Sequence, residues 1–69
     1  MAGKQSIDEL LKDEADIFNN IVGVYSYLNN NDKAIEYALK AKKVMDDNPG
    51  VDFKDLKPTI LGNLALLYE

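Results

Sequence analysis

The chain has 69 residues, a net charge of −4, and neither cysteine nor histidine. These absences exclude disulfides, thiolate nucleophiles, the usual zinc ligand sets and the commonest general base. The acidic balance disfavours nucleic acid or an anionic membrane surface as a partner. We therefore expect one small domain that is not an enzyme and has no cofactor.

The amino-terminal residues carry no recognisable targeting signal. Residues 1–5 are a methionine followed by small and polar residues, and no apolar run follows them. This pattern predicts neither a signal peptide nor a membrane span and favours a cytoplasmic location. We interpret residues 1–5 as a disordered tag or tail and residues 6–69 as one helical domain.

We expect a first helix over residues 6–29, because Ser6 and Glu9 have the spacing of a capping box. Apolar residues then recur at intervals of three and four in two adjacent stripes, which predicts two packing partners. The main stripe comprises Ile7, Leu11, Phe18, Ile21, Val22, Tyr25 and Leu28, and the second comprises Leu10, Ile17 and Val24. A solvated acidic face is expected from Asp8, Glu9, Asp13, Glu14 and Asp16.

A second helix is expected over residues 32–47. The run of asparagines at 29–31 ends the first helix, since asparagine readily adopts a left-handed conformation, and Asp32 is the predicted cap. Ala34, Ala38 and Ala41 form a line of methyl groups along one side of this helix, which lets another backbone approach closely. The acidic loop that follows has no glutamate to complete a calcium loop, so no metal site is expected.

A third helix is expected over residues 55–69. Either Asp52 or Asp55 could cap it, and we favour Asp55 because Pro58 then falls in the first turn, where its missing N–H has no consequence. The apolar pattern runs to the last residue without a stop signal. We interpret the chain as a fragment of a longer repeat protein or an engineered piece.

The first and third helices contain a repeat, because Phe18, Ile21, Val22 and Tyr25 are echoed at a constant offset by Leu61, Leu64, Ala65 and Tyr68. Together with the alanine line, this pattern resembles the tetratricopeptide repeat, which reads large-x-x-Leu-small-x-x-Tyr and then Ala-x-x-x-Phe-x-x-Ala. The long offset is similar to that of kinesin light chains and Rap-type peptide sensors. The sequence departs from the family pattern at Val22, Ala38 and Asp46, where a small residue, an aromatic and a proline are preferred.

The resemblance implies an all-α fold of about one and a half repeats: a helical hairpin plus a third helix that opens the next repeat. It further implies a non-catalytic interaction module whose first-helix groove binds a peptide or partner helix. Asn19 and Gly23 stand where chaperone-binding members carry a carboxylate clamp, so no chaperone-tail ligand is expected. The implied groove residues are Asp16, Asn19, Gly23, Ser26, Tyr27, Thr59, Gly62, Asn63 and Leu66.

An alternative interpretation is a structural self-assembling unit, either a homodimer or a helix-swapped form. It follows from the apolar surface of the third helix, which one hairpin is too small to cover. Of the tyrosines, we expect Tyr25 and Tyr68 in the core, Tyr27 against a ligand, and Tyr37 away from the main stripe. The predicted oligomer interface comprises Ile60, Leu61, Leu64, Leu67 and Tyr68.

Overall fold

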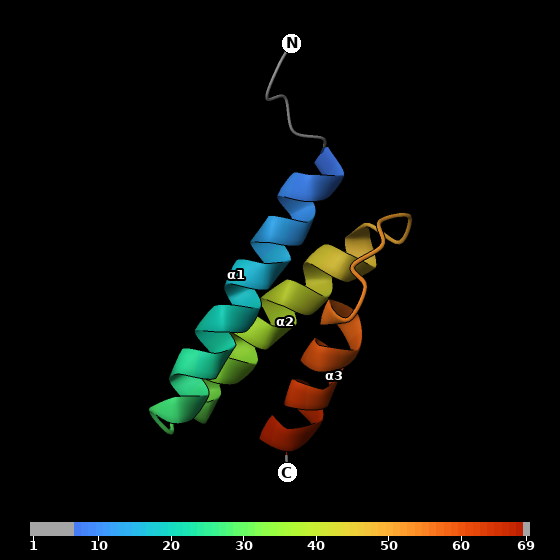
Figure 1. The fold of residues 1–69 in the computed structure, drawn as a ribbon. Coiled ribbons are helices and arrows are strands. Elements are labelled where there is room, and N and C mark those ends of the chain that lie inside the picture. The colour runs from blue at the N-terminus through green and yellow to red at the C-terminus, as the bar shows by residue number, and fades with distance from the viewer. Residues whose placement is uncertain (1–6, 69) are drawn as a thin grey trace.

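The chain folds into three α-helices. The computed structural model describes residues 7–68 and contains α1 (Ile7–Tyr27), α2 (Asn31–Asp47) and α3 (Leu56–Leu67). In Figure 1, α1 and α2 form an antiparallel hairpin, and α3 lies along α2 with little contact to α1. The all-α class and the helical hairpin are confirmed. The described helix ends fall within two residues of the predicted ones.

The turn between α1 and α2 depends on two asparagines. Asn29 has φ 60°, so it adopts the left-handed conformation that was expected to end the first helix. Asn30 is the amino cap of α2, and its side chain accepts a hydrogen bond of 3.3 Å from the Lys33 N–H. The predicted cap, Asp32, was wrong by two residues and lies in the first turn. The other predicted capping residue, Ser6, lies outside the described residues.

The core of the hairpin is built from small residues. Ala34, Ala38 and Ala41 are at most 1% exposed, which confirms that the methyl line of α2 faces its neighbours. On α1, fully buried Ala15 and Val22 alternate with partly buried large residues at spacings of four and three. The expected main stripe extended too far at both ends, because Ile7 and Leu28 are exposed. The residues of α1 that face the core are Leu11, Ala15, Phe18, Val22 and Tyr25.

An aromatic cluster joins the two helices of the hairpin. The Tyr37 ring stacks on Tyr25 with centroids 5.8 Å apart and meets Phe18 at 6.1 Å in a tilted arrangement. The Lys40 Nζ lies 4.6 Å from the centroid of the same ring. Tyr37, which was expected off the main stripe, is therefore a packing residue of the hairpin. Tyr37 supplies the aromatic contact that the sequence pattern placed at position 38.

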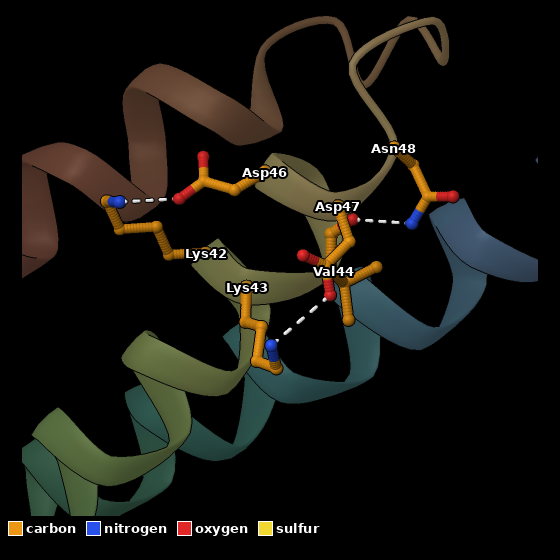
Figure 2. A network of polar contacts seen from close by, with 6 residues as sticks. All are labelled: Lys42, Lys43, Val44, Asp46, Asp47 and Asn48. Carbon is orange, nitrogen blue, oxygen red and sulfur yellow. Dashed lines mark hydrogen bonds and ion pairs between the residues drawn. The ribbon is translucent and has the colours of Figure 1, made fainter.

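Polar contacts stabilise the carboxyl end of α2. The Asn48 side-chain amide donates a 2.7 Å hydrogen bond to the Val44 carbonyl (Figure 2). The Asn48 N–H donates to the Met45 carbonyl. Lys42 donates to the Asp46 carboxylate at 2.6 Å. This bond lowers the pKa of Asp46 below the ordinary value of an aspartate, and the charge of Lys57 on α3 acts in the same direction.

The loop before α3 contains a buried aromatic residue, Phe53, that the sequence patterns did not identify. Asp52 accepts a 2.9 Å hydrogen bond from the Lys54 N–H, and Lys54 has φ 55°. Asp55 occupies the amino-cap position of α3 as predicted, but its side chain makes no capping hydrogen bond. Pro58 lies in the first turn of α3, as expected.

Candidate functional site

The structure brings one pair of the predicted groove residues together, on a surface that we call the α1–α3 face. Its centre is a hydrogen bond of 3.1 Å from the Asn63 amide nitrogen to the Asn19 side-chain oxygen. These two residues are half-buried, whereas the others are exposed. At 3.6 residues per turn the predicted positions on α1 share one side of that helix, as do those on α3. The α1–α3 face comprises Asp16, Asn19, Gly23, Ser26, Tyr27, Thr59, Gly62, Asn63 and Leu66.

Two positions of the α1–α3 face carry no side chain because they are glycines. A Cβ atom built at Gly23 or Gly62 meets nothing within 4 Å, so neither glycine is needed for close packing of the described chain. Glycine in the middle of a helix also lowers its stability relative to alanine. These glycines therefore leave space beside the Asn19–Asn63 pair at some cost to helix stability.

A pocket of about 280 Å³ lies beside Asp16, between the amino-terminal half of α1 and the loop that leads into α3. Four carboxylates and two lysines border it, so the pocket is acidic, and the buried Phe53 ring adds an apolar contribution. Glu9 and Lys12 form an ion pair of 4.0 Å on its α1 side. The lining residues are Glu9, Lys12, Asp13, Asp16, Asp52, Phe53, Lys54 and Leu56.

Sequence reasoning identified only Asp16 among the residues of this pocket. The α1 carboxylates were interpreted as a solvated face, and they are indeed exposed side chains. The pocket forms because the loop at 52–54 packs beside them, and a loop conformation with a left-handed Lys54 leaves no periodic signal in the sequence. The one available signal was Phe53, a large apolar residue between charged neighbours.

The chemistry that these residues offer is recognition of charge and of amide groups. Among the described residues, no group of acidic side chains is arranged to hold a metal ion. An exposed acidic pocket attracts lysine or arginine side chains, and asparagine side chains pair with the N–H and C=O groups of a peptide. The arrangement is therefore suited to binding a polypeptide with a basic residue.

The predicted oligomer interface on α3 is divided by the fold. Ile60 is fully buried and Leu64 is 7% exposed, so both belong to the core of the single chain and are not available to a partner. Leu67 is half-buried against the same core. Only Leu61, at 41%, and Tyr68, at 62%, remain exposed. Tyr68 is therefore not the core residue that the repeat pattern predicted.

The chain matches no protein-family model, no curated protein and no solved structure. None of the helices in the part of the chain that the structure describes is both long enough and apolar enough to cross a membrane.

Proposed function

We propose that the chain is a non-catalytic interaction module that binds a peptide or a partner helix along the α1–α3 face. The observation that carries the proposal is the Asn19–Asn63 hydrogen bond, because it joins the two helices at the centre of the face. The bond uses one atom of each amide. The other atoms, a donor on Asn19 and an acceptor on Asn63, can pair with the backbone of a bound segment.

The acidic pocket suggests what the bound segment carries. It lies beside Asp16, at the start of the α1–α3 face, and its carboxylates outnumber its lysines. We therefore expect a segment with a lysine or arginine at one end and an apolar residue further along. The apolar residue would contact Leu66 or Tyr27, which are 69% and 86% exposed.

The test uses short peptides that combine apolar residues with a single lysine, arginine or glutamate. Backbone amide shifts of the isotope-labelled chain are followed during titration with each peptide. We expect the basic peptides to shift Asn19, Gly23 and Asn63, and the glutamate peptide to have little effect. Shifts confined to other surfaces, or none with any peptide, would refute binding at this face.

A matched pair of variants tests the contribution of charge. Asp16→Asn removes a carboxylate beside the pocket, whereas Asp32→Asn removes one from an exposed position at the start of α2. We expect Asp16→Asn to weaken binding of the basic peptides several-fold, and more at low salt than at high salt, because exposed charges are screened. If the two variants weaken peptide binding equally, the effect of Asp16→Asn comes from the net charge of the chain and not from its position beside the pocket.

A structural self-assembling unit, homodimeric or helix-swapped, is a second candidate function. The apolar surface outside the core favours it, since large apolar residues are exposed on both outer helices. Light scattering on the purified chain over a range of concentrations tests it. The residues on α1 and α3 that supply this surface are Ile7, Leu10, Ile17, Val24, Tyr27, Leu61, Leu66 and Tyr68.

A further inference from the structure

The second apolar stripe of α1 is exposed. Leu10, Ile17 and Val24 are 51%, 57% and 57% exposed, so this outer stripe is not covered by the described chain. At 3.6 residues per turn it lies about a third of the way around α1 from the α1–α3 face and about as far from the surface that packs on α2. Leu28, 61% exposed, continues the stripe past the end of α1. Residues 7–68 therefore supply a packing partner for the first stripe of α1 and not for the second.

The outer stripe is symmetric about its central residue. Ile17 is the middle residue of α1, and Leu10 and Val24 lie seven residues before and after it. A two-fold axis through Ile17 would place two α1 helices antiparallel, with Leu10 of one copy against Val24 of the other and the two Ile17 side chains in contact. Seven-residue spacing keeps these side chains on one line of the helix, and it fills one of the two apolar positions that each heptad of a coiled coil carries.

The charge distribution along α1 selects the antiparallel arrangement. Five carboxylates and one lysine lie between Asp8 and Asp16, and residues 17–31 carry no charge. A parallel pair would bring the two acidic halves together, which is unfavourable. In the antiparallel pair each acidic half faces the uncharged half of the other copy, and Asp13 comes beside Asn20 of that copy, where an amide can donate to a carboxylate.

From these observations we propose that the outer stripe of α1 is the contact surface for a second copy of this chain, paired antiparallel with Ile17 on the two-fold axis. This inference rests on the second candidate function and deepens it by giving it a specific interface. The dimer leaves Asn19, Gly23 and Asn63 of the α1–α3 face open, and it shares Asp13 with the acidic pocket.

The size of the contact predicts a weak dimer. α1 has 21 residues, and a helix of that length is about 31 Å long and about 10 Å wide, so the contact covers roughly 300 Å² on each copy. Stable interfaces bury about 1,200–2,000 Å² in total. We therefore expect a dissociation constant on the order of 0.1–1 mM.

Cysteine cross-linking tests the arrangement, because the chain has no cysteine of its own. Under mild oxidation we expect Ile17→Cys to form a disulfide with itself. Leu10→Cys and Val24→Cys should cross-link to each other when mixed, and each should remain largely monomeric alone. Self-cross-linking of Leu10→Cys as efficient as that of Ile17→Cys would indicate a parallel or random contact and overturn the proposal.

Ultracentrifugation of lysine variants tests the surface. Ile17→Lys should raise the dissociation constant at least about tenfold, because two lysines would meet on the axis. Leu61→Lys, an equivalent change at an exposed position of α3, should leave it within about twofold. Circular dichroism checks that both variants keep their helices. Loss of the dimer only in Leu61→Lys would overturn this interface and leave self-assembly through α3.

A single monomeric species for the unmodified chain at about 2 mM would refute both this interface and the self-assembly function, since the expected constant lies below that concentration. It would leave peptide binding unaffected, because the amide-shift titration follows Asn19, Gly23 and Asn63, none of which belongs to the outer stripe.

Discussion

Enlarging a residue of the alanine line on α2 tests how closely the hairpin is packed. Ala41 is completely buried and belongs to the core cluster of the three helices. Ala41→Leu adds three carbons, which would stabilise the fold by about 2 kcal/mol if they could be buried without strain. Forcing extra carbons into a packed core instead costs about 1–3 kcal/mol net. We expect the net loss, and the same sign for Ala34→Leu.

Thermal unfolding followed by circular dichroism measures this change. For a domain of this size each kcal/mol lowers the midpoint by about 4–8 °C, so Ala41→Leu should melt roughly 4–24 °C below the parent. Ala65→Leu is the matched control, because it adds the same atoms at an exposed position of α3 and should melt near the parent. If Ala34→Leu and Ala41→Leu melt like Ala65→Leu, the alanine line does not set the helix separation.

Three further changes have expected outcomes. Gly23→Ala should stabilise the fold by about 0.5–1 kcal/mol in urea unfolding, because its Cβ meets no neighbour; destabilisation would mean that the α1–α3 face closes over Gly23. Phe53→Ala should lose about 3–5 kcal/mol in the same assay, and a loss below 1 kcal/mol would place that ring outside the core. Lys42→Gln should raise the pKa of Asp46 in an NMR titration, whereas Lys43→Gln should not. Because the folded-state pKa is lowered, the stabilisation by Lys42 is present above the ordinary aspartate pKa and is lost as pH falls through the folded-state value, so Lys42→Gln and the parent should converge in stability in acid.

The features that sequence reasoning predicted correctly are those determined within a few residues. The left-handed Asn29, the buried alanine line and the position of Pro58 in the first turn of α3 each follow from a local conformational preference. The family resemblance implied Asn19 and Asn63 as groove residues, and the structure joins them by a hydrogen bond. The sequence did not predict that contact.

The features that sequence reasoning missed depend on which element packs against the residue in question. Tyr37 sits one residue before the alanine at position 38, and only the presence of Phe18 and Tyr25 on α1 makes it a packing residue. Phe53 is buried by a loop whose course no periodicity describes. Tyr25 and Tyr68 occupy equivalent positions of the predicted repeat. The Tyr25 ring is covered by Tyr37, whereas Tyr68 has no aromatic ring stacked on it among the described residues and is exposed.

Because each side of α1 has different neighbours, this helix can bind a peptide on one side and a second copy of the chain on another. Its core stripe is used by α2, its polar side meets α3 through Asn19, and its outer stripe remains exposed. A dimer formed through the outer stripe would carry two α1–α3 faces, one on each copy. A partner with two linked basic segments would then bind the dimer more tightly than the monomer, provided its linker spans the two faces. Ile17→Ser, which adds no charge beside the acidic pocket, should abolish that gain while leaving the affinity for a single segment unchanged. The comparison separates the contribution of assembly from that of the binding face itself.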